Sequence, residues 1–517
     1  LCTMPEGAAT ALIRLLAALP ASHVLLAAGA AGRAPTSARL LTSAHALALV
    51  RYTHALLRSL LPPPLHAHAS RADPIERHAT IALLHSRATL LAIQSHSHSA
   101  PAVERATPTS PQPSSSPPPL PPPPLLADGV ERPPASPLPA PAHAPAPPAE
   151  HALVGAQLGG AWPPPSAGLD EAAALLEHAR VRGLPASRSG ESLALALAAE
   201  RLVRAAAFQS DPRGVDAVAR GAAALCARLA LEGAHGGGED ASAQLGALRL
   251  ASATLDVLGS SSALRALAPD AEGVAVGALG SLVGAAASAP ARSAEPVLAG
   301  CVRALVAVVG APPAASADGV EAQRWAMVQL PALRAIATAA CSRSDDRACE
   351  AIGALHALLG TEAWAALPAR AWLEVVTLVL LPPASVALRA CRTSSALGFA
   401  RAGGAPSAAA EQRAARGAHA LFAPLLPRLP ALLAEPAFVP AWLQLVGELQ
   451  HAARGAACDG ARDVLSHALS TALQRMAVAG FFAPSAPGSP PRSAAHAVWD
   501  ASQRLLDELQ PRPSGLA

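Results

Sequence analysis

The sequence predicts an all-α protein, an α-solenoid of irregular HEAT/armadillo/TPR-like helical hairpins with one disordered Pro-rich segment. Apolar residues make up 51% of the chain but aromatic residues only 3%, so a core must be built from Ala, Leu and Val. Apolar residues recur at helical spacing, and no segment shows the sustained alternation of a half-buried strand. Such helices cannot bury their apolar stripes alone, and stacking them in antiparallel pairs creates a continuous core.

The composition predicts three parts along the chain. Residues 1–100 form a helical N-terminal segment whose role the sequence leaves open. Residues 101–166 form a linker, because 19 of the 50 residues at 101–150 are Pro, which has no amide donor and breaks helices. Its run PPPLPPPPLL suits either a solvated spacer, which we favour, or a ligand of SH3 or WW modules. Residues 169–510 form the helical array.

The stretch Cys341–Leu388 predicts one unit of that array. An acidic start at Asp345 and Asp346, which we expect to cap the helix, precedes an apolar stripe. A second helix is expected after Pro368, and the pair at 382–383 is expected to end it.

Two helices near the C-terminus have the clearest periodicity. Trp442 begins one stripe that continues through Leu449. The next stripe has the spacing i, i+3, i+4, i+7 and i+11, at Leu465, Ala468, Leu469, Ala472 and Met476. Gly480 follows, where a left-handed helix cap suits glycine.

Charge and cysteine content narrow the function classes. The net charge of +3 predicts no nucleic-acid interface, which would need a clustered basic face. The seven Cys are scattered without any CxxC pair, which predicts buried free thiols in a reducing compartment. No apolar run is long and uncharged enough to predict a transmembrane segment, and no signal peptide is apparent.

Catalytic and metal-binding patterns are absent from the sequence. It contains no GxxxxGK[ST], GxSxG or HExxH, and without any Lys a P-loop lysine is impossible. The His pairs at 66/68 and 96/98 sit in loop-like contexts without further ligands, so we predict no zinc site there. We therefore expect no catalytic, cofactor-binding or metal residues, and not an enzyme.

Residues 321–510 carry an ordered series of tryptophans. Trp325 leads a helix that ends at Cys341, and the turn SRSDDR at 342–347 precedes a helix containing Ile352 and Leu355. Trp372 leads the helix after that. The series continues through Phe438, Trp442, Leu469 and finally Trp499, which precedes LLDEL at 505–509.

This order resembles the C-terminal helical region of the large brefeldin-A-resistance, GNOM-type exchange factors for Arf GTPases. The resemblance implies that the eight residues named are structural, packing between helices. It implies a non-catalytic regulatory or scaffold region acting in Golgi vesicle-mediated transport, cytoplasmic and peripheral on Golgi membranes. The implied partners are Arf-family or Rab-type GTPases and Golgi membrane adaptors, with a homodimer in the full-length protein. The family's Sec7 domain uses a Pro-Gly-Glu loop, which this chain lacks.

Two alternatives remain open on the sequence alone. The first is a generic HEAT- or armadillo-type adaptor that binds peptides and has no link to GTPases. The second is a poorly folded product of a GC-rich reading frame, since all 39 basic residues are Arg and Asn is absent.

Overall fold

The structure is a computed structural model, and it describes residues 51, 54–55, 74–99, 165–182, 189–235, 241–267, 269–288, 295–312, 319–399, 408–454, 459–483 and 492–509. The chain divides into two compact units, residues 1–93 with 164–517 and residues 94–163. Almost all the described residues belong to the first unit. Of the predicted Pro-rich segment 101–166, residues 101–164 lie outside the described residues, and the last two residues begin a helix.

The described residues form helices and no strands, so the predicted all-α class is confirmed. In the first part of the chain the helices are α3 (Pro74–Ser99), α5 (Pro165–Arg182), α6 (Ser189–Ala206), α7 (Pro212–His235), α8 (Ala241–Gly259), α9 (Ser262–Leu267), α10 (Pro269–Ser288) and α11 (Glu295–Val309). The second part contains α12 (Gly319–Arg324), η3 (Trp325–Gln329), α13 (Leu330–Ala340), α14 (Asp345–Leu359), α15 (Glu362–Ala365), α16 (Ala369–Val375), η4 (Val376–Leu380), α17 (Leu381–Phe399), α18 (Ala408–Leu425), η5 (Leu426–Arg428), α19 (Leu429–Leu432), α20 (Phe438–Ala453), α21 (Asp459–Val478) and α22 (Arg492–Leu509).

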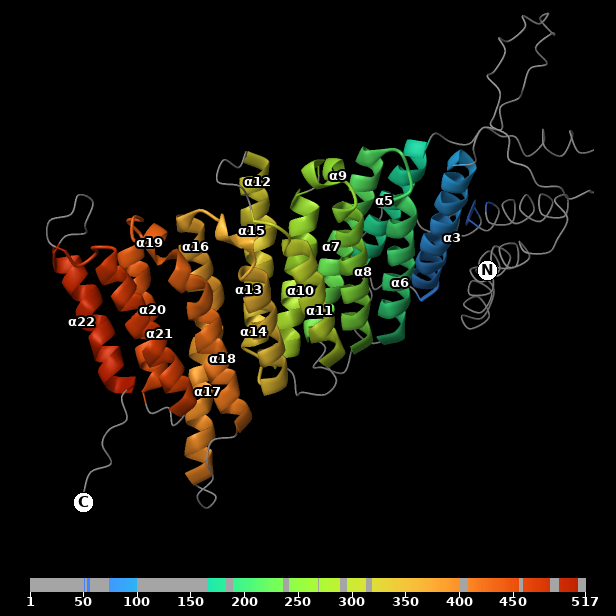
Figure 1. The fold of residues 1–517 in the computed structure, drawn as a ribbon. Helices are drawn as coiled ribbons and strands as arrows, with labels where there is room; N and C mark the ends of the chain where they lie inside the picture. The colour runs from blue at the N-terminus through green and yellow to red at the C-terminus, as the bar shows by residue number, and fades with distance from the viewer. Residues whose placement is uncertain are drawn as a thin grey trace, which may run out of the picture. The chain divides into compact units, whose positions relative to one another are not determined.

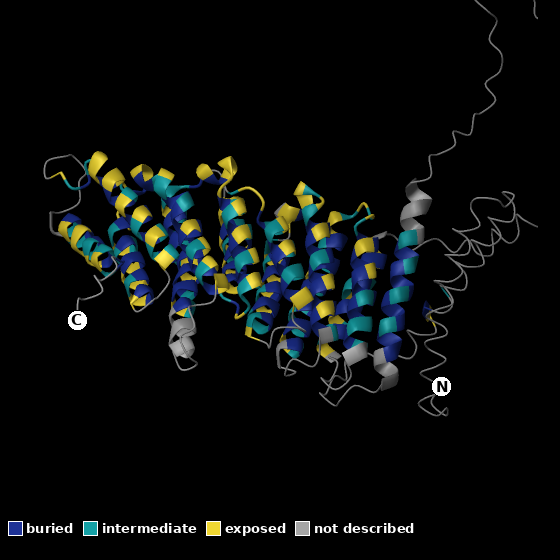
Figure 2. Ribbon diagram, turned by 60° about the horizontal axis from the view of Figure 1, so that its bottom comes forward, coloured by how far each residue is buried: buried dark blue, intermediate teal, exposed yellow. Residues whose placement is uncertain are grey.

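The helices of the first unit stand side by side in chain order (Figure 1). One layer contains α5, α7, α10, α13, α17 and α20, each packed against the next, and the other contains α6, α8, α11, α14, α18 and α21. Helices adjacent in sequence also pack as pairs between the layers, as α7 does with α8 and α13 with α14. Buried residues lie on the faces where helices meet, and exposed residues lie on the outer faces (Figure 2).

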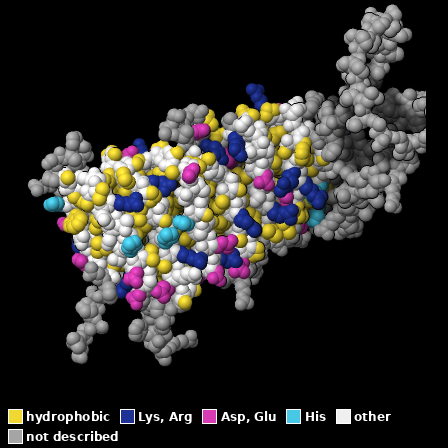
Figure 3. All heavy atoms as spheres, viewed as in Figure 1, with side chains coloured by type: hydrophobic (Ala, Val, Ile, Leu, Met, Phe, Trp, Pro, Cys, Tyr) yellow, Lys and Arg dark blue, Asp and Glu magenta, His cyan; other side chains and the backbone are white. Residues whose placement is uncertain are grey.

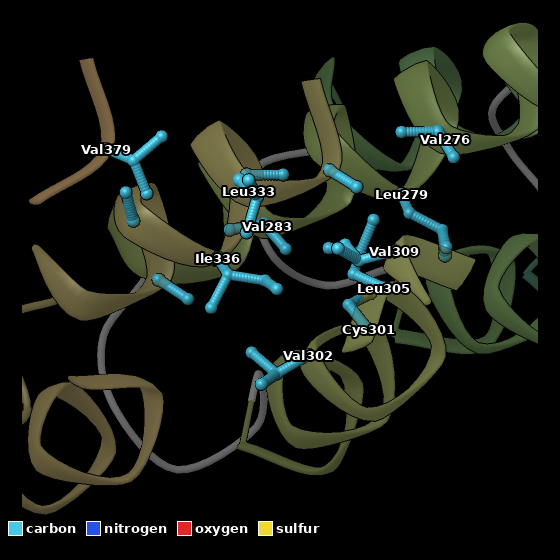
Figure 4. Packing of buried hydrophobic residues seen from close by; sticks show 14 of the residues in the cluster. Val276, Leu279, Val283, Cys301, Val302, Leu305, Val309, Leu333, Ile336 and Val379 are labelled. Carbon is cyan, nitrogen blue, oxygen red and sulfur yellow. The ribbon is translucent and has the colours of Figure 1, made fainter. Parts of the chain in front are cut away.

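The core is one continuous cluster of apolar side chains. Figure 4 shows part of it, where Leu279 and Val283 of α10 lie near Leu305 of α11 and Leu333 and Ile336 of α13. Burying a side chain of this size contributes about 1.5–3 kcal/mol. The cluster therefore holds the two layers together along the whole unit.

Helix α3 belongs to the same core, although its residues fall within the predicted N-terminal segment 1–100. Arg87 Nε donates to the carbonyl of Gly168 at 3.0 Å, and Gln209 Nε2 donates to the carbonyl of Leu91 at 2.9 Å. Leu83 and Leu91 are fully buried in the common cluster. The first helix after the Pro-rich segment begins at Pro165, four residues before the predicted start of the array.

The expected helix stop at residues 382–383 is wrong. The chain remains helical from α16 through η4 into α17, and the two prolines lie in the first turn of α17. Immediately before them, the amide of Leu381 donates to the carbonyl of Val376, a wide π-helical turn. The same arrangement precedes Pro331, where the amide of Leu330 donates to Trp325. We attribute the continuity to the π turn, which moves the carbonyl that a proline ring would otherwise strike.

Candidate functional site

The structure buries seven of the eight residues that the sequence analysis named as structural. They are Trp325, Ile352, Leu355, Trp372, Phe438, Trp442 and Leu469. Trp442 is only 2% exposed, and its indole Nε1 donates to Ser502 Oγ of α22 at 3.0 Å. The sequence analysis did not include Trp364, which is also buried and whose Nε1 donates to the carbonyl of Gly310 at 3.2 Å.

The eighth residue, Trp499, is 42% exposed, which corrects its predicted place in the core. Its neighbour Val498 is fully buried instead. The cause is position: α22 is the last helix of the described residues, and within them no other helix follows it. The Trp499 ring packs edge-on against Phe482, with centroids 5.3 Å apart.

The acidic turn before α14 also differs from the expectation. Ser344 precedes the helix, and Asp345 and Asp346 lie in its first turn rather than at its cap. Asp345 Oδ1 instead accepts a charged hydrogen bond from Arg413 Nη1 of α18 at 3.1 Å. The Arg413 side chain is 3% exposed and also donates to the carbonyl of Ala340. Asp345 therefore links α14 to α18, which belong to two neighbouring helix pairs.

A Ser–His–Glu cluster that the sequence did not reveal lies between residue 54, α3 and α5. Ser86 Oγ lies 2.8 Å from His54 Nδ1, and Glu171 Oε1 lies 3.2 Å from His54 Nε2. However, Ser86 donates its hydroxyl proton to the carbonyl of Leu83. A nucleophilic serine must be reachable by its substrate, which a buried hydroxyl is not. Ser86 is also 2% exposed, so this cluster ties the segment containing His54 to the core.

Two of the free cysteines lie in the buried core, where they are poorly placed to react. The Cys226 and Cys301 thiols are free and buried, and burial raises the pKa of both, which disfavours the reactive thiolate. Cys391 is disulfide-bonded. The prediction of free thiols is therefore wrong for Cys391.

Within the described ranges, no three His, Cys, Asp or Glu side chains cluster as metal ligands. His96 and His98 lie in α3 rather than in a loop. Pro269–Ser288 and Ala369–Cys391 are long and apolar enough to cross a membrane by length and composition, but half or more of each is buried in the protein core.

An open groove of about 740 Å³ lies between α8 and α11. Its floor is made of apolar and small side chains, among them Leu248, Leu255, Gly300 and Ala304. A Cβ on Gly300 would lie 2.5 Å from Leu248 Cδ2, so the glycine lets the two helices approach at the floor. Residues of α6, α9, α10 and α12 complete the walls. We call this depression the α8–α11 groove.

Charged side chains form the walls of the α8–α11 groove. The lining contains five arginines and three carboxylates, which leaves an excess of positive charge. These residues are Arg204, Arg249, Arg265, Arg303, Arg324, Glu200, Asp256 and Glu272. Figure 3 shows basic side chains gathered over the region of α6, α8 and α11, on the face turned to the viewer.

Two buried glutamates orient three of these arginines. Glu200 of α6 accepts from Arg204 at 3.2 Å and from Arg249 at 3.0 Å. Glu272 of α10 accepts from both Nε and Nη2 of Arg324, whose Nη2 also donates to the carbonyl of Val308. Such bidentate pairing fixes the guanidinium plane.

Comparison with known proteins supplies no relative: no family model, no curated protein and no solved structure matches this chain.

Proposed function

We propose that this chain is a non-catalytic binding scaffold, an irregular solenoid of HEAT- or armadillo-like helix pairs that docks a partner in the α8–α11 groove. The two layers of helices packed in chain order support the solenoid assignment. The single observation that carries the function is the open groove on one layer, with a small-residue floor and walls held by buried glutamates. We propose further that the Pro-rich segment 101–166 is a solvated spacer.

Site-specific crosslinking tests the scaffold proposal. A photoreactive amino acid at Ser252, in the groove, is compared with one at Arg334, an exposed position on α13 outside it. We expect a protein crosslinked from position 252 that is absent from position 334 and lost when R303E is added. Equal crosslinking from both positions, or none from 252, would count against the groove as the docking surface.

We also propose a narrower function, the regulatory region of a Golgi Arf exchange factor. The observation that favours it is the ordered aromatic series, of which Trp325, Trp372 and Trp442 pack in the core. Burial is equally expected of any helical scaffold, so the narrower proposal depends on the order of these residues in the sequence. With this narrower function we also propose a location on Golgi membranes and Arf-family or Rab-type GTPases as partners.

Binding to purified GTPases separates the two proposals. The chain is immobilised, and Arf-family and Rab-type GTPases are passed over it loaded with GDP or with a nonhydrolysable GTP analogue. Binding that depends on the nucleotide state supports the exchange-factor proposal. Binding to neither class in either state removes that proposal and leaves the generic scaffold intact.

A further inference from the structure

We propose that the occupant of the α8–α11 groove is an acidic, extended peptide segment of a partner protein, an inference that rests on the proposed scaffold function. The recognising groups are the arginine side chains that line the groove, beside apolar side chains such as Leu248 and Leu255. A segment that alternates acidic and apolar side chains satisfies both features.

The wall arginines are held in place before any partner binds. Arg249, which lines the groove, donates from its Nε to Glu200 and keeps its terminal nitrogens for a ligand. Arg265 donates from Nη2 to the carbonyl of Gly259 at 2.8 Å, at the C-terminal end of α8. A guanidinium carries five N–H donors, so each of these residues keeps donors for a ligand. Because their rotamers are already fixed, less side-chain entropy is lost when a carboxylate docks.

Arg303 on α11 is the cation most available to a ligand. It lines the groove, is exposed, and has no ion-pair or hydrogen-bond partner among the described residues. The other four arginines each have a carboxylate or a carbonyl as partner. Arg303 therefore carries part of the excess positive charge of the groove, together with Arg265, whose partner is a neutral carbonyl. We expect an acidic side chain of the partner to pair with Arg303.

The dimensions of the groove suit a short extended segment. The lining residues of α8 run from Leu248 to Gly259 and those of α11 from Gly300 to Val308. At 1.5 Å per helical residue this corresponds to a length of about 12–17 Å. An extended chain rises about 3.3 Å per residue, so roughly four or five residues fit. The volume of about 740 Å³ lies within the usual range for a bound ligand of this size.

The mixed charge of the walls favours a peptide over a nucleic acid. Glu200, Asp256 and Glu272 stand among the arginines and would repel a continuous phosphate backbone. A phosphate backbone has no apolar groups to pack on the apolar floor, whereas the aliphatic side chains of a peptide can be buried there. A nucleic-acid interface would need a continuous basic face, which this groove lacks.

Fluorescence anisotropy of the full chain with labelled peptides tests the proposal. The probe is a peptide of alternating Glu and Leu, and a Gln–Leu peptide of equal length is the neutral control. R303E reverses the charge at position 303 and removes the positive excess of the groove, and R343E makes the same change at an exposed loop position between α13 and α14. A307W fills the groove sterically, and A357W adds the same ring at an exposed position of α14. Circular dichroism melts confirm that each variant is folded.

We expect the Glu–Leu peptide to bind, and R303E to weaken it roughly tenfold or more, as for loss of a charged hydrogen bond. A307W should also weaken it, while R343E and A357W change it less than about twofold because distant sites are independent. Rising salt should weaken binding.

Three results would overturn the acidic-peptide assignment. The first is equal binding of the Gln–Leu peptide or no binding of either. The second is equal weakening by R303E and R343E. The third is tighter binding of tripolyphosphate or single-stranded RNA that R303E abolishes, which would make the groove a phosphate site. The crosslinking from Ser252 is read separately, so the scaffold can stand when the peptide chemistry fails.

Discussion

The two parts of the helical unit fill their cores with different side chains. From α3 to α11 the described core consists mainly of Ala, Leu and Val, and the aromatic residue Phe208 is 74% exposed. From η3 to α22 the core includes buried tryptophans and phenylalanines, such as Trp364 and Phe422. Small side chains let helices approach closely, as at Gly246, where an added Cβ would lie 2.8 Å from Ala196 Cβ. Aromatic rings instead fill wider gaps between helices.

The two parts differ in their expected roles: the aromatic part packs the core, and the aromatic-poor part binds a partner. The aromatic part carries the residues of the family resemblance, while the aromatic-poor part carries the α8–α11 groove. In the aromatic part, rings such as Phe438 and Trp442 interlock at a centroid distance of 5.8 Å. We therefore expect large stability effects in the second part and binding effects in the first.

The largest effect is expected when an aromatic core residue is truncated. Trp442→Ala should lower the free energy of unfolding by about 3–5 kcal/mol, because it leaves a cavity and removes the hydrogen bond to Ser502. Trp499→Ala is the matched control and should cost less than about 1 kcal/mol, since this ring is 42% exposed. Urea unfolding followed by circular dichroism measures both. Equal losses would mean that burial does not distinguish these tryptophans.

The ion pair between α14 and α18 should respond asymmetrically. Asp345→Asn leaves the buried Arg413 without its charged partner and should cost about 3 kcal/mol. Arg413→Met leaves Asp345, which is 31% exposed and can be hydrated, so a much smaller loss is expected. Thermal melts of both variants at neutral pH compare them. A larger loss of stability from Arg413→Met than from Asp345→Asn would contradict the claim that the unpaired, buried charge of Arg413 causes most of the cost.

The aromatic-poor part should have its own pH dependence through His85 of α3. Burial, with a further contribution from the Arg201 charge, lowers the pKa of His85 from 6.5 to about 4. Between those pH values the unfolded chain binds the proton and the folded chain does not, so stability falls as pH drops from about 6.5 towards 4. The loss should reach about 3 kcal/mol, at 1.36 kcal/mol per pKa unit.

Urea unfolding of the wild type and His85→Asn across this pH range measures the effect. The variant should show a shallower dependence by about that amount. Identical pH profiles for the two proteins would contradict the placement of His85.

The smallest effects compare glycines in the two parts. Gly246→Ala, in α8, should destabilise by about 1–2 kcal/mol because the new methyl strikes Ala196. Gly447→Ala, in α20, meets nothing within 4 Å and should stabilise the helix by about 0.5–1 kcal/mol. Thermal melts of the two variants measure both changes in stability. A gain from Gly246→Ala would show that α6 and α8 are less closely packed than described.

The sequence predicted features that depend on local periodicity. The stripe from Leu465 to Met476 is buried, and Gly480 has the left-handed φ of 76° expected of a helix cap. The continuation of the helix through Pro382 was not predictable, because it depends on a π turn with no separate sequence signature. Trp499 differs from Trp442 only in what covers its helix, which is a tertiary property.

The α8–α11 groove could not be predicted from the sequence, because it also depends on tertiary packing. Glu200, Arg249 and Arg324 come from three helices, and only the packing of α6 with α8 and of α10 with α12 brings the paired groups together. The charge balance gave no signal either, because isolated charges of both signs on helices are normally just solvated.

Hydrogen exchange with and without the Glu–Leu peptide tests the central claim most directly. We predict slowed exchange confined to the segments that line the α8–α11 groove, in α8, α9 and α11, with α14 to α22 unchanged. Slowed exchange in α14 to α22 alone, or no change in the groove segments at saturating peptide, would contradict the account.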